Sequence, residues 1–159
     1  MPLDFDLNEE QQMLRKMVRN FAEKEIAPVA QELDDKEEFS YHLTKRMGEL
    51  GLFGPFVPEE YGGSNVGYVG YIISVEEIAR IDGSQAATLA AGNSLGISPI
   101  YYYGNEEQKQ KWLPDLCSGK ALSSFGLTEP NAGSDAGASK TNAVLEGDHW
   151  VINGSKIFI

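Results

Sequence analysis

The sequence predicts a mainly α-helical protein, with an orthogonal or up-and-down helical domain followed by the first strands of an antiparallel β domain. Two observations support this fold class. Apolar residues recur at helical spacing through most of residues 9–117, and after Ser118 and Gly119 the pattern becomes extended. We therefore expect a helical domain over residues 1–119 and the truncated start of a β domain over residues 120–159.

Five helices are expected in the first domain. Capping boxes, in which an asparagine is followed three residues later by a glutamine, indicate two of the starts. Serine N-caps indicate two others. The expected ranges are 9–35, 41–50, 68–81, 85–98 and 106–117, with capping boxes at Asn8 and Asn105 and serine caps at Ser40 and Ser84.

Prolines and glycines divide these ranges. Pro28 should kink or interrupt the first helix, Gly51 should end the second, and Pro114 can split the last. Pro99 should end the fourth helix and begin a short turn of three tyrosines, which Gly104 closes. Because the fourth range is apolar around most of its circumference, we expect it to be the central buried helix.

The last helix should bury Trp112, Leu113 and Leu116. Beyond it, the sequence Asn153-Gly154 is a strong hairpin signal. The predicted extended segments are 121–127, 141–146, 149–153 and 155–159. Since the chain stops inside the last segment, we expect an incomplete sheet that cannot bury its own face.

Composition limits the classes of function. The net charge of −11 and the scattered basic residues argue against a nucleic-acid-binding surface and disfavour an anionic membrane. The first ten residues, MPLDFDLNEE, are acidic where a targeting peptide would be basic and apolar. No apolar run long enough to span a membrane is expected, because glycines, Asn93 and Pro99 break the most apolar stretch.

Few residues outside the segment 125–138 suggest chemistry. The single cysteine, Cys117, lies in an apolar helical pattern and is interpreted as a packing residue that fits a reducing compartment. His42 and His149 are isolated, and no metal-ligand spacing exists. The glycine-rich segment YGGSNVGYVG lacks the lysine and hydroxyl residue of a phosphate loop, so it is a weak nucleotide signal.

The segment 125–138, FGLTEPNAGSDAGA, has the composition of a shaped turn. Glycine allows backbone N–H groups to point outward beside Ser134, so the turn could receive a phosphate or a planar ring that carries acceptor atoms. A purely structural connection is the other interpretation. The carboxylates of Glu129 and Asp135 are interpreted as structural acceptors of backbone N–H groups, not as general bases.

The pattern G-L-T-E-P-x-x-G-S-D-x-x-A at residues 126–138, followed by Thr141 and WVINGSKIFI, resembles the acyl-CoA dehydrogenase family. The segments EEYGGS at 59–64 and EEQKQKWLP at 106–114 also resemble that family. The resemblance covers essentially the entire chain but only the amino-terminal portion of the family pattern, of the short- or medium-chain type. It implies a helical domain followed by a middle β-barrel domain.

The resemblance further implies an FAD-dependent flavoprotein of fatty acid metabolism that removes hydrogens from the α and β carbons of acyl-CoA thioesters. Leu127 and Thr128 would offer backbone and hydroxyl hydrogen bonds to the pyrimidine edge of the flavin. Phe125 would line the ring's surroundings. Ser134, after Gly133, would lie where the FAD pyrophosphate and the acyl-CoA substrate approach each other.

Phe158 matches a position beside the flavin that is usually tryptophan, so the aromatic face is kept and the indole N–H is lost. The family's catalytic glutamate lies in the carboxy-terminal half. We therefore expect no catalytic residue here, and we expect the 159-residue chain to be inactive alone.

The resemblance implies electron-transfer flavoprotein as the redox partner and a homo-oligomer for the full-length enzyme. It also implies the cytoplasm of a bacterium or, after processing, the mitochondrial matrix. Two alternatives stay open: another flavoenzyme of the same fold, of the nitroalkane oxidase or flavin monooxygenase type, and a non-catalytic helical interaction module.

Overall fold

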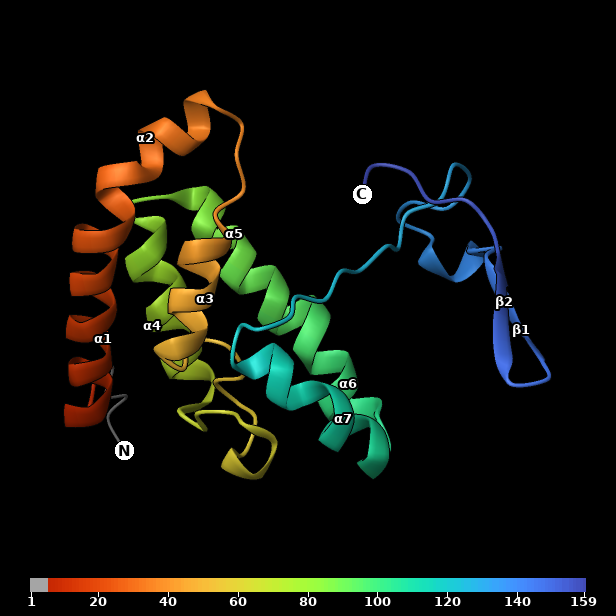
Figure 1. Ribbon diagram of the computed structural model, residues 1–159, viewed down its shortest axis with the longest axis horizontal. Coiled ribbons are helices and arrows are strands. Elements are labelled where there is room, and N and C mark those ends of the chain that lie inside the picture. Colours follow the sequence, from red (N-terminus) through yellow and green to blue (C-terminus); the bar gives the residue numbers. More distant parts are fainter. Residues whose placement is uncertain (1–5) are drawn as a thin grey trace. The chain divides into compact units, whose positions relative to one another are not determined.

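The computed structural model describes residues 6–159 as two compact units that divide between Ser123 and Ser124 (Figure 1). The first unit is helical, and the second contains a two-stranded sheet, which confirms the predicted fold class. The elements are α1 (Glu9–Phe21), η1 (Ala22–Ile26), α2 (Ala27–Asp35), α3 (Tyr41–Glu49), η2 (Glu59–Tyr61), α4 (Gly67–Ala79), α5 (Gly83–Ala91), η3 (Gly92–Ile97), α6 (Ser98–Tyr103), α7 (Glu106–Cys117), η4 (Ala136–Ala138), β1 (Asn142–Glu146) and β2 (His149–Asn153).

The amino-terminal segment for which the sequence predicts no targeting signal lies partly outside the described residues. Within residues 6–159, no helix combines the length and the apolar character that crossing a membrane requires.

The predicted N-caps are confirmed at three helix starts. The Asn8 side chain accepts from the Gln11 N–H at 2.8 Å, and the Gln11 side chain accepts from the Asn8 N–H at 3.1 Å, which completes the predicted capping box of α1. The same kind of capping box forms at the start of α7, between Asn105 and Gln108. Ser40 caps α3, which ends before Gly51 in the left-handed region at φ 70°.

The predicted cap at Ser84 is wrong. Helix α5 begins at Gly83, two residues earlier than predicted, because the Asp82 carboxylate accepts from the Ser84 N–H at 2.7 Å and from the Gln85 N–H at 3.2 Å. An aspartate adds charge to the cap and is favoured at the positive end of the helix dipole.

Two of the predicted proline effects are absent: Pro99 does not end its helix, and Pro114 does not split α7. A wide π-helical turn, η1, precedes Pro28, and a second one, η3, precedes Pro99. Such a turn relieves the clash between the proline ring and the carbonyl of the preceding turn. The three tyrosines after Pro99 therefore continue the helix as α6, and α7 runs unsplit through Pro114.

In the helical unit, α4 packs between α1 and α5 (Figure 1). The prediction that residues 84–98 are buried around most of the circumference is wrong, because Leu95 is 47% exposed while Leu89 and Ile97 are buried. Trp112 is also half exposed, whereas Leu113 and Leu116 are buried as predicted. The core consists of Val18, Phe21, Ala22, Ile26, Leu43, Met47, Leu52, Phe53, Phe56, Val57, Tyr61, Ile78, Ala86, Leu89, Ile97, Leu113, Leu116 and Cys117.

The glycine-rich loop after η2 is a packing device. A Cβ at Gly63 would lie 2.0 Å from the Val57 carbonyl oxygen, and one at Gly62 would lie 3.2 Å from the Pro114 Cα. These glycines allow backbone and core to approach closely. The weak nucleotide signal of this segment therefore has a structural explanation.

In the second unit, β1 and β2 form an antiparallel hairpin in which Glu146 pairs with His149 and Asn142 with Asn153. Gly147-Asp148 separates the two strands, as expected from the predicted segments 141–146 and 149–153, whereas the hairpin predicted at Asn153-Gly154 does not form. A Cβ at Gly154 would lie 2.0 Å from the Thr141 hydroxyl oxygen and 2.7 Å from the Thr141 Cα, so this glycine serves close packing instead.

The predicted strands at 121–127 and 155–159 do not form within the described residues. Segment 155–159 makes one backbone hydrogen bond just beyond the first segment, from the Ile157 N–H to the Thr128 carbonyl at 3.0 Å, which is too little for a ladder. All ten residues of β1 and β2 are exposed, so the hairpin leaves both faces uncovered, as predicted for a sheet that cannot bury its own face.

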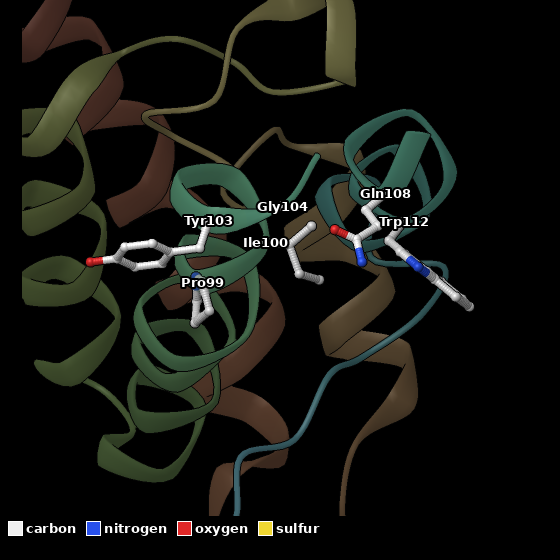
Figure 2. A pocket seen from close by; sticks show the side chains of 6 residues that line it. All are labelled: Pro99, Ile100, Tyr103, Gly104, Gln108 and Trp112. Atoms are coloured by element: carbon white, nitrogen blue, oxygen red, sulfur yellow. The ribbon is translucent and has the colours of Figure 1, made fainter. Parts of the chain in front are cut away.

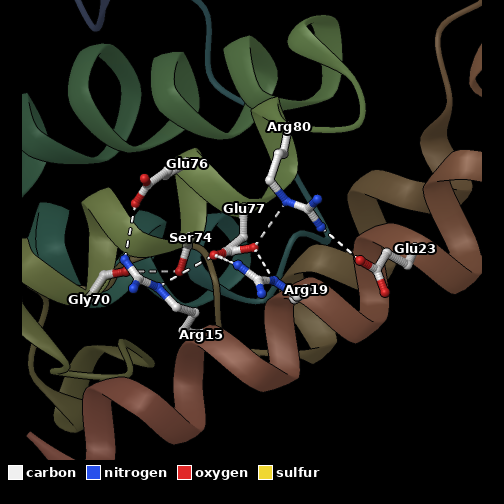
Figure 3. Close-up of polar contacts among 8 residues, drawn as sticks. All are labelled: Arg15, Arg19, Glu23, Gly70, Ser74, Glu76, Glu77 and Arg80. Carbon is white, nitrogen blue, oxygen red and sulfur yellow. Dashed lines mark hydrogen bonds and ion pairs between the residues drawn. The ribbon is translucent and has the colours of Figure 1, made fainter. Parts of the chain in front are cut away.

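An ion network ties α1 to α4 around one buried carboxylate (Figure 3). The Glu77 side chain is only 2% exposed and accepts two hydrogen bonds from Arg19, both at 2.8 Å. Arg15 Nε and Arg80 Nε complete the surroundings of the carboxylate at 3.4 Å and 3.5 Å. The hydrogen bonds with Arg19 are the main cause that lowers the pKa of Glu77, so the group stays ionised despite burial.

Replacing Glu77 by Gln should lower the free energy of unfolding of the helical unit by about 2 kcal/mol, because two charge-assisted hydrogen bonds are lost. Glu76→Gln is the matched control, since the Glu76 side chain is 62% exposed and, among residues 6–159, forms an ion pair with Arg15 alone. It should cost less than about 0.5 kcal/mol. Urea unfolding followed by helical circular dichroism measures both, and equal costs would show that burial of Glu77 is unimportant.

Candidate functional site

The turn at residues 125–138 folds around a short backbone bridge. The Glu129 N–H donates to the Ala132 carbonyl at 3.0 Å, and the Ala132 N–H donates to the Glu129 carbonyl at 3.1 Å. Pro130 and Asn131 form the tip, which fits the turn preference of these residues. The 3₁₀ turn η4 then leads toward β1.

The Glu129 carboxylate anchors this turn. Its side chain is 7% exposed and accepts from the Lys140 N–H at 2.7 Å, the Thr141 N–H at 3.0 Å and the Lys156 ammonium at 2.9 Å. The Lys140 N–H is the largest cause that lowers the pKa of Glu129 to about 2, and Thr141 and Lys156 add to it.

This environment confirms that Glu129 accepts backbone N–H groups, although the donors lie farther along the chain than the turn itself. A carboxylate with so low a pKa, which already accepts three hydrogen bonds, is a poor general base. The same prediction for Asp135 is wrong, because its exposed carboxylate accepts no hydrogen bond from residues 6–159.

Lys156 links the turn to the carboxy-terminal segment. Its ammonium donates to the Leu127 carbonyl at 2.8 Å as well as to Glu129. The adjacent Ile157 N–H donates to the Thr128 carbonyl. The sequence interpretation missed Lys156, and the available signal was a lone cation between a glycine and an apolar run.

The residues predicted to contact a cofactor fall into two groups. Leu127 and Thr128 are held by the segment that leads to Phe158, through the contacts with Lys156 and Ile157. Gly133 and Ser134 lie on the exposed part of the turn, and within the described chain no hydrogen bond joins them to the first group.

Apolar surfaces and unused hydrogen-bond donors occur together in the first group. Phe125 and Leu127 are 45% and 44% exposed, and Phe158 is 91% exposed at φ 59°, a rare conformation for a bulky residue. The Thr128 N–H and hydroxyl have no acceptor among residues 6–159. Such a surface can receive a flat, partly polar group.

A separate pocket of about 370 Å³ lies in the helical unit between α6 and α7. Figure 2 shows Tyr103 and Trp112 on opposite sides of it, with Ile100 and Gln108 between them. The Gln108 side chain already accepts from the Asn105 N–H in the capping box, so its carbonyl oxygen is used. The pocket contains none of the predicted cofactor-binding residues.

Other reactive side chains are buried or isolated. Cys117 is 1% exposed, and burial raises the pKa of its thiol to about 11, which confirms a packing role. His42 and His149 are exposed. Within residues 6–159, no group of three or more His, Cys, Asp or Glu side chains is placed to hold a metal ion.

Two family descriptions match the chain in order. The acyl-CoA dehydrogenase N-terminal domain matches residues 8–120, and the acyl-CoA dehydrogenase middle domain matches residues 124–159. Among curated relatives, a probable acyl-CoA dehydrogenase, YngJ, of Bacillus subtilis is 55% identical over 157 residues. A short-chain specific acyl-CoA dehydrogenase of Clostridium acetobutylicum is 50% identical over 157 residues.

Both matches cover 99% of this chain but only 41% of the relative, so the chain spans well under half the length of these proteins. Solved structures give the same result. A chain from an Acidaminococcus fermentans structure described as electron transferring flavoprotein has a TM-score of 0.93 and 47% identity, with 98% and 41% coverage. A Bacillus anthracis acyl-CoA dehydrogenase complexed with FAD has a TM-score of 0.88 and 42% identity, with 95% and 26% coverage.

The Glu129 carboxylate should titrate with a midpoint of about 2 in the folded chain and near 4.5 in urea. Because the folded pKa is the lower one, Glu129 stabilises the turn fully above about pH 4.5, and this contribution is lost as the pH falls to about 2. Carbon-13 NMR of the side-chain carboxylate measures both midpoints. A folded midpoint near 4.5 would contradict the anchoring role.

Proposed function

Because the chain belongs to the acyl-CoA dehydrogenase family, we propose that it forms the amino-terminal part of an FAD-dependent enzyme that dehydrogenates acyl-CoA thioesters between the α and β carbons. The observation that carries this proposal is the ordered match of two domains over residues 8–120 and 124–159. We also propose that residues 1–119 form the helical domain and residues 120–159 the start of the middle β domain. The compact division between Ser123 and Ser124 supports this assignment.

The residues present fit a flavin. Thr128 offers an unused N–H and hydroxyl beside the half-exposed side chains of Phe125 and Leu127. A Cβ at Gly133 would meet nothing within 4 Å, so the backbone next to Ser134 is open to a bulky anionic group. A flat ring with acceptor atoms and a pyrophosphate match these features.

We assign cofactor binding to Phe125, Leu127, Thr128, Gly133, Ser134 and Phe158, and substrate binding also to Ser134. When bound, FAD supplies the two-electron acceptor for the substrate's β-hydrogen. The residues of this chain bind and orient: Thr128 donates hydrogen bonds, while Phe125, Leu127 and Phe158 cover the ring and exclude water.

No proton-abstracting residue is assigned here, since Glu129 is committed to three hydrogen bonds and Asp135 is solvated. The α-proton would be removed by a carboxylate elsewhere in the complete enzyme. For that enzyme we propose a short-chain acyl-CoA substrate, which the 50% identity to the Clostridium relative supports.

We further propose electron-transfer flavoprotein as the redox partner, a homo-oligomeric assembly, and a cytoplasmic location in a bacterium. The similarity to a chain in the Acidaminococcus structure supports the proposed redox partner. The single cysteine, which is buried and reduced, fits the proposed location.

The complete enzyme carrying this chain should contain FAD and reduce a dye with butyryl-CoA faster than with long-chain acyl-CoA. The isolated 159-residue chain should be at least about 100-fold slower, because it lacks the general base. Dye-coupled turnover and flavin absorbance measure these outcomes, with a nitroalkane as the control substrate. Nitroalkane oxidation without acyl-CoA turnover, or rapid turnover by the isolated chain, would overturn the proposal.

A further inference from the structure

We propose that Lys156 is a positioning residue, which orients the peptide group between Leu127 and Thr128 so that its N–H faces an acceptor on the flavin ring. The geometry of Lys156 is independent of any ligand. Only the identity of the acceptor rests on the function proposed above.

The first step concerns the direction of one peptide group. The Lys156 ammonium donates to the Leu127 carbonyl at 2.8 Å. The peptide bonds of the described chain are trans, so the carbonyl and the N–H of one peptide group point in opposite directions. The Thr128 N–H, which belongs to the same group, therefore points away from Lys156.

The second step concerns which donor is left unused. In the next peptide group both ends are occupied, because the Thr128 carbonyl accepts from Ile157 and the Glu129 N–H donates to Ala132. The Thr128 N–H has no acceptor in residues 6–159. Of these two successive groups, only the one that Lys156 holds presents a free donor.

The third step concerns how firmly Lys156 is held. Its ammonium also contacts the Glu129 carboxylate at 2.9 Å, and that carboxylate is fixed by the Lys140 and Thr141 backbones. Charge-assisted hydrogen bonds of this length are stronger than neutral ones. Lys156 therefore fixes the Leu127 carbonyl relative to the Glu129 carboxylate.

The fourth step concerns charge. A cation at the carbonyl end of a peptide group polarises the group and makes its N–H a stronger donor. Reduction adds electron density to the acceptor atom of the flavin, so this donor stabilises the reduced flavin more than the oxidised flavin. Loss of Lys156 should therefore weaken FAD binding and lower the flavin reduction potential.

The experiment compares three variants of the complete FAD-loaded enzyme. Lys156→Met should raise the FAD dissociation constant about 10-fold or more and lower the reduction potential, because the charge-assisted hydrogen bonds to the Leu127 carbonyl and the Glu129 carboxylate are both lost. Lys156→Arg keeps the charge and should recover part of both. Lys140→Met, the matched control, removes an exposed cation whose side chain makes no hydrogen bond or ion pair among residues 6–159, and it should change neither.

A second measurement needs no FAD. In the 159-residue chain, proton–nitrogen NMR should show a shifted Thr128 amide and faster amide exchange at Glu129 with Lys156→Met but not with Lys140→Met. Circular dichroism tests whether each variant is folded. If Lys156→Met is not folded, the spectrum of Lys156→Arg is compared with the wild type in its place.

The two sets of results separate the two proposals. A wild-type enzyme that binds no FAD refutes the proposed function, and the Thr128 amide then decides the positioning role alone. Wild-type FAD binding that Lys156→Met leaves unchanged, or that Lys140→Met weakens equally, overturns the positioning role.

Discussion

The second unit depends on the buried carboxylate of Glu129. One side chain joins the turn at 127–132, the backbone at Lys140 and Thr141, and the ammonium of Lys156. The hairpin of β1 and β2 cannot take this role, because all of its residues are exposed. A paired acid with several hydrogen bonds is the strongest local constraint available where no apolar core has formed.

The helical unit uses the same device beside a large apolar core. Glu77 is buried between α1 and α4 and is surrounded by three arginines, so its charge is compensated without leaving the interface. The difference lies in what else holds each unit. Side chains such as Phe53, Met47 and Leu89 fill the helical core. In the second unit, residues 124–159, Ala132 alone is a buried apolar residue.

A glutamate next to the proposed flavin-binding segment is an obvious candidate for a catalytic base, and the structure explains why Glu129 is a poor one. Its low pKa and its three donors follow from the same contacts that shape the turn. In the proposed site, the carboxylate holds Lys156 and through it the Leu127–Thr128 peptide group. Proton transfer and cofactor orientation are in this way assigned to different parts of the proposed enzyme.

The sequence by itself determined the helical class, both capping boxes, the turn composition of residues 125–138 and the family, because these depend on neighbours within a few residues or on a contiguous pattern. Tertiary structure decided the partners of Glu129, the role of Lys156, the close approach at Gly154 and the exposure of Trp112. It also decided that only two of the extended segments pair. The physical reason is that these features depend on which distant segments meet, and a residue's own neighbours in the sequence do not specify that.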